Sequence, residues 1–220
     1  MVMITRKEVV MKIILFLAIG LIVGVLILSS GLFQKIFWVK IAKPVIYLYP
    51  ETTQTVTISL ETDGDIFVSD PQIKGNSWTV MANPSGDIVY EGEHYPYLFY
   101  ESLTAQKFNL DEGWVIPRSD MTPWFGDYLP KFGLNEAETS DFVEYWGVNL
   151  PDSEYYLISL INVPSLERAT KLVIEPEPDT LIRVILLIKP LDAPVEIPEP
   201  EIDTPERKGF VAVEWGVVLQ

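Results

Sequence analysis

The sequence contains no cysteine and one histidine, His94. The absence of cysteine excludes disulfide bonds, thiol nucleophiles and thiolate metal sites, so packing must hold the fold. His94 lies among turn residues, where we expect it to be exposed to solvent. A Ser-His-Asp triad and a multi-histidine zinc site are both unexpected with so little histidine. The sequence therefore predicts no metal ion and no cofactor.

Basic residues are scarce after position 43. Residues 44–220 carry ten basic residues against thirty acidic ones, a net charge of -20. Phosphate binding requires a basic surface, so we expect no nucleic-acid partner. The acidity is typical of a surface that keeps a domain soluble, and cation binding is the alternative interpretation.

One long hydrophobic run is present near the amino terminus. Residues 13–33 are twenty-one residues without a charge, between Lys12 and Lys35. As a helix they would reach about 31 Å, close to the hydrocarbon thickness of a bilayer. A cleaved signal peptide is the alternative, but its apolar core would be shorter and a small-residue cleavage site would follow it. We predict a transmembrane helix over residues 13–38.

The orientation of this span follows from the lengths of the two flanks, since their positive charges nearly balance. Long domains translocate largely regardless of charge. We therefore expect residues 1–12 in the cytoplasm and an extracytoplasmic domain over residues 42–220, with Phe37 and Trp38 at the membrane interface. Gly20 and Gly24 form a G-x-x-x-G pair, which predicts a packing face for a protein partner or a second copy of the chain. Chance is the alternative, because glycine is common in membrane helices.

After the span, short β-type segments are separated by turns. Residues 56–60 alternate apolar and polar side chains, and Asp63-Gly64 predicts a hairpin turn after them. The aromatic run 45–49 predicts a strand that begins almost at the membrane, and a turn at residues 84–86 predicts a second hairpin. Residues 181–188 are apolar at nearly every position and should be covered on both faces. Further strands are predicted at residues 78–82, 95–103, 155–162, 170–176 and 210–218.

A helical segment interrupts these strands at about residues 120–147. Ser119-Asp120 is a candidate N-cap, Asn135 with Glu138 resembles a capping box, and Gly147 is a candidate helix end. The stretch from 190 to 209 is rich in proline and predicts an extended loop. The expected fold class is therefore α+β: a mainly antiparallel, β-sandwich-like domain with a two-helix insertion, preceded by one transmembrane helix.

Several motifs together resemble an uncharacterised family of anchored or secreted bacterial proteins. They include AKPVIYLYPE (residues 42–51), YPYLFYE (95–101) and TPERKGFVAVEWG (204–216), in one continuous order over residues 42–216. The resemblance implies a single domain that contains the helical segment. It implies no catalytic residue and no ligand.

Three carboxylates are candidates for catalysis. Glu101, Glu144 and Glu214 each lie beside tyrosine or tryptophan. Aromatic rings stack on sugars and two carboxylates can act as acid and base, which is the pattern of a hydrolase acting on envelope glycan or peptide. The alternative is that the aromatic residues form the core and the acids pair with Arg118, Arg183 or Arg207. The favoured hypothesis is a membrane-anchored interaction domain that acts as a subunit or accessory of an envelope or membrane assembly, and the hydrolase is the alternative.

Overall fold

The strands of the domain form two sheets that pack face to face. Nearly all neighbouring strands are antiparallel, and β11 and β12 form the one parallel pair among residues 38–220. The larger sheet has seven strands in the order β3 (Ile66–Asp70), β7 (Leu98–Thr104), β1 (Val39–Tyr49), β12 (Val211–Leu219), β11 (Thr180–Leu191), β9 (Tyr155–Leu160) and β8 (Trp114–Pro117). The smaller sheet has five strands in the order β10 (Thr170–Glu175), β2 (Gln54–Thr62), β4 (Ser77–Ala82), β5 (Ile88–Tyr90) and β6 (Glu93–Tyr95).

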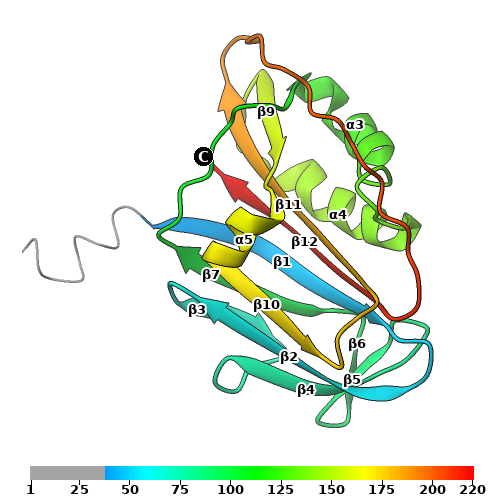
Figure 1. The fold of residues 1–220 in the computed structure, drawn as a ribbon. Helices are drawn as coiled ribbons and strands as arrows, with labels where there is room; N and C mark the ends of the chain where they lie inside the picture. The colour runs from blue at the N-terminus through cyan, green and yellow to red at the C-terminus, as the bar shows by residue number, and fades with distance from the viewer. Residues whose placement is uncertain (1–37) are drawn as a thin grey trace, which may run out of the picture. The chain divides into compact units, whose positions relative to one another are not determined.

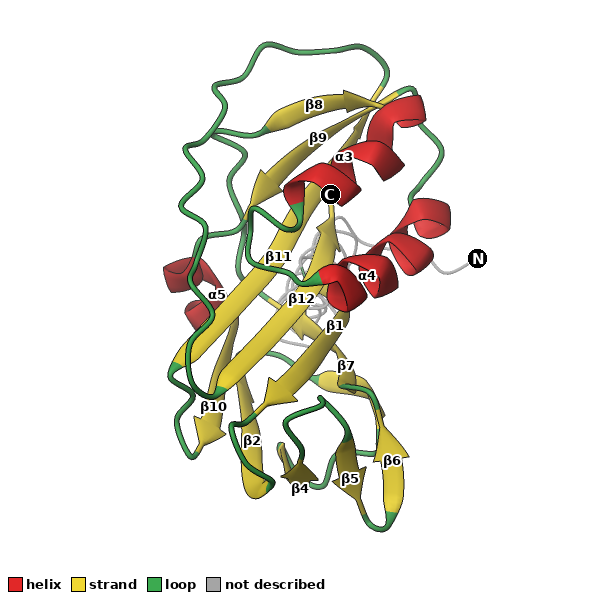
Figure 2. Cartoon of the chain, turned by 90° about the vertical axis from the view of Figure 1, so that its right-hand side faces the viewer, coloured by secondary structure: helices red, strands yellow, loops and turns green. Residues whose placement is uncertain are grey.

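Two helices cover the other face of the larger sheet. These are α3 (Met121–Tyr128), which a 3-10 turn at Arg118–Asp120 precedes, and α4 (Glu136–Asn149) (Figures 1 and 2). Their apolar side chains pack with those of the sheet in a core that contains Phe142, Trp146 and Trp215. A second core, which contains Trp78 and Tyr100, lies between the two sheets. The chain thus forms three layers, with the larger sheet in the middle.

A short helix, α5 (Val163–Ala169), covers a third and smaller core. The sequence did not predict this helix. Its signals are local: Asn162 accepts a hydrogen bond of 3.0 Å from the backbone N–H of Ser165, and Pro164 stands in the first turn.

The sandwich-like α+β fold and both predicted helices agree with the sequence, but several boundaries and one turn were wrong. The Asn135–Glu138 capping box is formed, whereas Asp120 makes no side-chain cap. Gly147 lies inside α4, which runs on to Asn149 because a helical glycine costs only about 1 kcal/mol. The turn at Asp63-Gly64 joins no hairpin, since β2 and β3 belong to different sheets.

Strands β11 and β12 are parallel neighbours, so the chain must return along their length between them. The proline-rich residues 192–210 make this return without regular structure (Figure 1). Gly133 lies at the end of the loop that precedes α4, and Pro205 packs so closely against it that an added Cβ would lie 2.5 Å from the proline ring. The extended loop predicted here is confirmed, and it contributes Arg207 to the site described below.

The computed structural model describes residues 38–220, and the compact unit in it is Val39–Gln220. The predictions for residues 1–12, for the span that starts at residue 13, and for Gly20, Gly24 and Phe37 lie outside the described residues. Trp38 is half-buried just before β1. Among the described helices, none has the length and apolar character needed to cross a membrane.

Candidate ligand-binding cleft

The first unusual feature of the larger sheet is a β-bulge in β1. Between Ala42 and Val45, β1 has one residue more than the facing stretches of β12 and β7, so its register shifts against both neighbours. Lys43, within the bulge, has a left-handed φ of 55°, a conformation that costs a non-glycine residue about 1–2 kcal/mol. Gly216 on β12 makes room for the bulge, because a Cβ there would lie 3.1 Å from the Cα of Pro44.

The bulge directs the side chain of Lys43 toward the helix layer. Its Nζ lies 4.2 Å from the ring centre of Phe99, 5.2 Å from that of Tyr97 and 5.4 Å from that of Tyr145 on α4. Within residues 38–220 it makes no ion pair. Burial lowers the pKa of Lys43, and the nearby carboxylates oppose this effect. Cation–π contacts thus join β1, β7 and α4 at one point.

Glu101, a predicted catalytic residue, supports this bulge. One carboxylate oxygen accepts the backbone N–H of Lys43 at 3.4 Å, and the other lies 2.7 Å from Nζ of Lys40. A bulge leaves a backbone N–H without its strand partner, and the carboxylate supplies a replacement. The position of Glu101 is therefore explained by local structure.

A cleft opens beside this region, between the amino-terminal half of α4 and the turn that joins β4 to β5. We call it the Tyr47 cleft. Its volume is about 430 Å³, within the range of small-ligand sites. Its lining comes from segments far apart in the sequence: Tyr47, Tyr49, Ser85, Gly86, Asp87, His94, Tyr95, Pro96, Ala137 and Asp141.

Two tyrosines of β1 form the inner wall of the cleft. The rings of Tyr47 and Tyr49 are nearly parallel, with ring centres 6.3 Å apart, and Tyr97 packs edge-on against Tyr47. The Tyr47 hydroxyl donates a 2.7 Å hydrogen bond to Oδ2 of Asp141 on α4. Burial, and then the bond to Asp141, raise the pKa of the Tyr47 hydroxyl well above its ordinary value. Tyr47 is thus a neutral donor, fixed in place without a ligand.

The outer wall of the cleft carries a second acid. Asp87 accepts a hydrogen bond of 3.0 Å from the side chain of Asn83, and its two oxygens lie 2.9 and 3.0 Å from Nδ1 of His94. His94 is exposed, as the sequence predicted, although it lies on β6 and not in a turn. Gly86 is required beside this acid: its φ is 89°, and a Cβ there would lie 2.7 Å from the ring of Tyr49.

The base of the cleft is held by a buried ion pair. Glu138 is fully buried in the first turn of α4, and Arg207 donates two hydrogen bonds of 2.9 Å to its carboxylate. Arg207 also donates to the carbonyl of Gly133 at 2.9 Å, and its guanidinium lies 5.2 Å from the ring centre of Tyr49. Burial, and then the negative charge of Glu138, raise the pKa of Tyr49. The proline-rich loop is therefore fastened to the start of α4 directly behind the cleft.

The structure separates the three predicted carboxylates. Glu214 is buried between the sheets, where it accepts hydrogen bonds from Tyr100 at 2.6 Å and Arg183 at 2.7 Å. Side chains alternate along β7, so Glu101 points to the opposite face of the larger sheet from Tyr100. Glu144 is exposed on α4. Glu101 and Glu214 therefore cannot share one cleft, and the pairing of an acid with Arg183, weighed as the alternative, is present.

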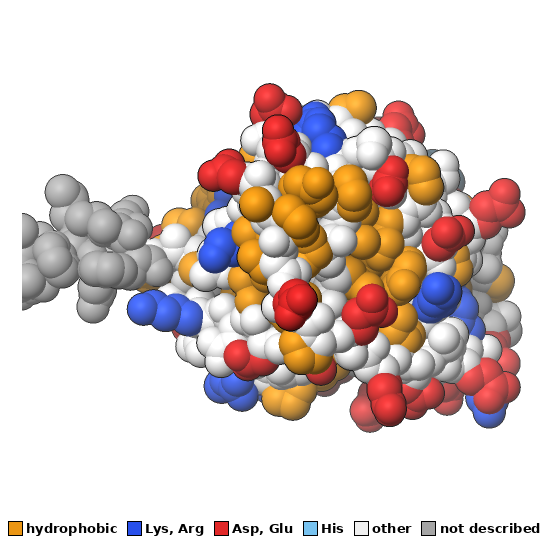
Figure 3. Space-filling view, turned by 90° about the horizontal axis from the view of Figure 1, so that it is seen from above, with side chains coloured by type: hydrophobic (Ala, Val, Ile, Leu, Met, Phe, Trp, Pro, Cys, Tyr) orange, Lys and Arg blue, Asp and Glu red, His pale blue; other side chains and the backbone are white. Residues whose placement is uncertain are grey.

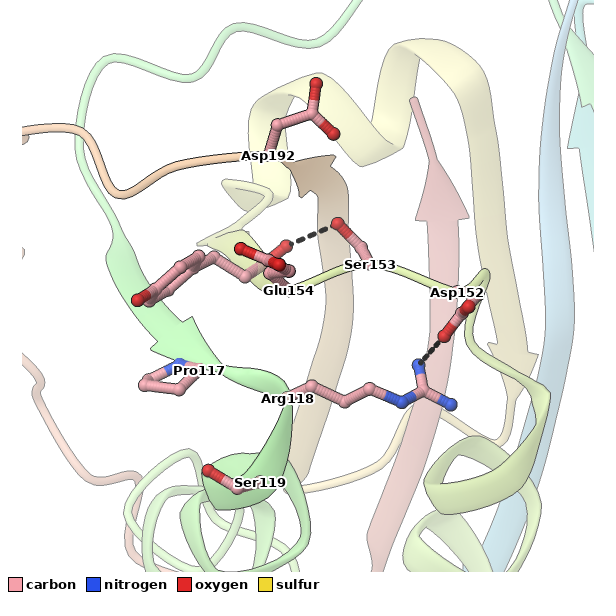
Figure 4. Close-up of a pocket in the computed structure, with 8 residues that line it drawn as sticks. Pro117, Arg118, Ser119, Asp152, Ser153, Glu154 and Asp192 are labelled. Carbon is pink, nitrogen blue, oxygen red and sulfur yellow. Dashed lines mark hydrogen bonds and ion pairs between the residues drawn. The ribbon is translucent and has the colours of Figure 1, made fainter.

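A broad surface depression beside β8 is a weaker candidate for a site. Pro117, Arg118, Ser119, Asp152, Ser153 and Asp192 line it, with Glu154 and Tyr155 (Figure 4). Arg118 points toward Asp152, at 3.7 Å, and donates to the carbonyl of Pro151 at 3.2 Å. Its positive charge is already used to join the start of the helix layer to the chain before β9.

Acidic side chains are spread over the surface and not concentrated at one point. On the face seen in Figure 3, hydrophobic side chains gather near the middle and acidic ones lie around them. In residues 38–220, no three histidine or acidic side chains lie close enough together to hold a metal ion. The charge of the domain therefore does not by itself mark a site.

Sequence reasoning missed the residues that build the cleft. Tyr47 and Tyr49 were assigned only to a strand, and Asp141 only to a helix. The segments that supply these residues lie far apart in the sequence, and no local pattern in one of them indicates the others.

Comparison with known proteins gives limited information about this chain. No protein-family model matches it, and no match to a solved structure was found. It is similar to a protein described as "Uncharacterized protein in bglA 3'region" from Butyrivibrio fibrisolvens, with 43% identity over 61 residues. The match covers 27% of this chain and 64% of that protein. The similarity adds no activity, so the function must be argued from the cleft.

Proposed function

We propose that this protein is a single-pass, membrane-anchored binding protein whose extracytoplasmic domain recognises a ligand in the Tyr47 cleft. The observation that supports this most strongly is the convergence of four separate chain segments on one cleft, in which the Tyr47 wall is held by Asp141 before a ligand binds. A wall that is fixed before the ligand arrives loses little conformational entropy on binding. The uncharged residues 13–33 support the anchor, and the domain begins directly after it, at Val39.

Binding is a better account of the cleft than hydrolysis. Glu214 is buried and paired with arginine, and Glu101 caps a backbone N–H. Neither is free to act as an acid or base on a ligand, and Glu144 is exposed on α4 with no hydrogen bond among the described residues. The hydrolase hypothesis therefore has no carboxylate pair from its three candidates.

The cleft can be tested by filling it in a strain that lacks the chromosomal gene. Ala137 is exposed on α4 and lines the cleft, so Ala137→Trp should block the cleft without disturbing the core. Val148→Trp changes a residue of the same helix that is 77% exposed and lies outside the cleft. We expect the first variant to fail to restore the deletion phenotype and the second to restore it, at equal protein abundance.

Two results would contradict this proposal. If Ala137→Trp fully restored the deletion phenotype, the cleft would not be needed for the function. Loss of restoration by Glu101→Gln or Glu144→Gln, in protein that is folded and abundant, would favour the hydrolase. The anchor and its orientation are tested separately. Protease added to intact spheroplasts should digest residues 39–220. Complete protection of these residues before lysis would show that the domain lies on the cytoplasmic side.

A further inference from the structure

The charges that line the Tyr47 cleft restrict the ligand. Its ionisable lining residues are Asp87, Asp141, His94 and three tyrosines, and no lysine or arginine is among them. Lys43 and Arg207 are not part of the lining: Lys43 lies among three aromatic rings, and Arg207 is paired with Glu138. An anionic ligand would meet two carboxylates in the lining and no lysine or arginine there. A phosphate or carboxylate ligand is therefore disfavoured.

Two carboxylates, which only accept hydrogen bonds when ionised, line the cleft beside hydroxyl groups that can both donate and accept. Asp141 uses Oδ2 for the Tyr47 hydroxyl, and its Oδ1 has no hydrogen-bond partner among residues 38–220. The Tyr47 hydroxyl donates a hydrogen bond to Asp141, and a phenol oxygen can accept one as well. Asp87 accepts from Asn83 and contacts His94, and carboxylate oxygens have further lone pairs. A ligand rich in hydroxyl donors matches this arrangement.

The cleft also has apolar lining. Tyr95, Pro96 and Ala137 line it together with Tyr47 and Tyr49. Aromatic and aliphatic side chains pack against the C–H faces of a sugar ring, while the hydroxyl groups at the ring edge can donate to acceptors such as Asp87 and Asp141. Apolar lining with carboxylate acceptors beside it is therefore complementary to the neutral saccharides.

We propose that the Tyr47 cleft binds a short neutral saccharide, with its ring on Tyr95 and Pro96 and its hydroxyl groups donating to Asp141 and Asp87. This inference rests on the proposed binding function and names the ligand class for the same site. An organic cation held by rings and carboxylates is the other ligand that an acidic aromatic cleft suits, and the test distinguishes the two classes.

The test uses the full chain in lipid nanodiscs prepared without glycosidic detergents. Ligand-observed NMR and calorimetry would compare neutral oligosaccharides with matched sugars in which one hydroxymethyl is oxidised to a carboxylate or one hydroxyl is replaced by an amine. We expect binding of a neutral sugar and at least about tenfold weaker binding of its uronate. Asp141→Asn should weaken binding of the neutral sugar about tenfold, and Asp152→Asn, in the depression beside β8, should leave it unchanged.

Each other outcome decides between the two proposals. Tighter binding of the amino sugar by tenfold or more would replace the saccharide class with a cation and leave the binding function standing. Binding of no sugar, or binding that Asp141→Asn and Tyr95→Ala do not alter, would overturn the saccharide inference while the phenotype test with Ala137→Trp still decides the function. Cleavage of a bound sugar, seen as product in the NMR spectrum, would keep the class and overturn the binding function.

Discussion

Arg207 and Glu138 form a two-bond ion pair in which both hydrogen bonds measure 2.9 Å and the carboxylate is fully buried. The two residues are 69 positions apart in the chain. Glu138 also accepts the backbone N–H of Asn135 at 2.7 Å. One carboxylate therefore both caps α4 and fixes the return loop between β11 and β12, and each of these supports a wall of the Tyr47 cleft.

Removing Arg207 should be costly because it leaves Glu138 buried without its counter-charge. We expect Arg207→Ala to lower the free energy of unfolding by about 3–5 kcal/mol. Arg207→Lys keeps the charge but loses the planar two-bond geometry, so its loss should be smaller. Urea unfolding of the two variants checks the order. Equal stability of Arg207→Ala and the unaltered protein would show that the pair contributes nothing to the fold.

Two substitutions at Lys43 distinguish the contribution of its backbone conformation to stability from that of its side chain. Lys43→Ala removes the cation–π contacts and keeps the left-handed φ of 55°, whereas Lys43→Gly removes the contacts and relieves the strained conformation. Both variants should be less stable than the unaltered protein. Relief of the strained φ raises the stability of the glycine variant, and the larger entropy that glycine loses on folding offsets part of this gain. We therefore expect the free energy of unfolding of Lys43→Gly to be higher than that of Lys43→Ala by about 1 kcal/mol or slightly less. The reverse order in urea unfolding would exclude backbone strain at this position.

Regular elements were predictable from the sequence where one local signal sufficed. The apolar run 181–188 has buried residues on both faces of β11, and the strand assignments after residue 150 hold. The capping box at Asn135 placed the start of α4. The turn at Asp63-Gly64 failed because a tight turn fixes the local chain direction but not the sheet that the next strand joins.

The cleft was not predictable in the same way, because its residues meet only through sheet register and helix packing. Tyr47 and Asp141 are 94 positions apart, and nothing local in either segment indicates the other. Glu101 illustrates the opposite case. A carboxylate among aromatic residues has the composition of an active site, yet Glu101 lies inside β7 and supplies an acceptor to a bulged backbone N–H. Composition cannot distinguish the two uses, since the bulge appears only when β1 is paired.

Two glycines in different surroundings should respond oppositely to the same change. A Cβ at Gly216 would lie 3.1 Å from the Cα of Pro44 and 3.1 Å from Cδ1 of Ile185, and a backbone atom cannot easily give way. Gly216→Ala should therefore cost about 1–3 kcal/mol. A Cβ at Gly126 in α3 meets nothing within 4 Å, so Gly126→Ala should stabilise the protein by about 0.5–1 kcal/mol through helix propensity. Urea midpoints that moved in the same direction would contradict the packing argument.

Alkaline pH should unfold the domain through its buried tyrosines. Burial is the main cause that raises the pKa values of Tyr47, Tyr49, Tyr97 and Tyr100 in the folded state. The unfolded chain titrates near pH 10, so this contribution to stability is complete below about pH 10 and is lost as the pH rises above it. Lys43 acts in the opposite sense, because its pKa is lowered.

Urea midpoints measured at increasing alkaline pH, with the ultraviolet absorbance of tyrosinate as a second signal, would check this loss. Tyr49→Phe removes one of the four groups and should make the decline shallower. A decline that begins well below pH 10 would point to other titrating groups.

The last prediction concerns whether Glu214 is structural or catalytic. Its two oxygens hold Arg183 at 2.7 Å and Tyr100 at 2.6 Å, and Arg183 also contacts Glu167 at 2.6 Å. Glu214→Gln keeps the shape but removes the negative charge beside a buried guanidinium, so we expect unfolding free energy to fall by about 3 kcal/mol. Adding Arg183→Met should recover part of this loss, because the uncompensated charge is removed as well, and a double-mutant cycle measures the coupling.

Glu144→Gln, on the exposed face of α4, serves as the control and should leave the urea midpoint unchanged. If Glu214→Gln were as stable as the unaltered protein and yet failed to restore the deletion phenotype, the carboxylate would be acting on a ligand and the structural role would be wrong.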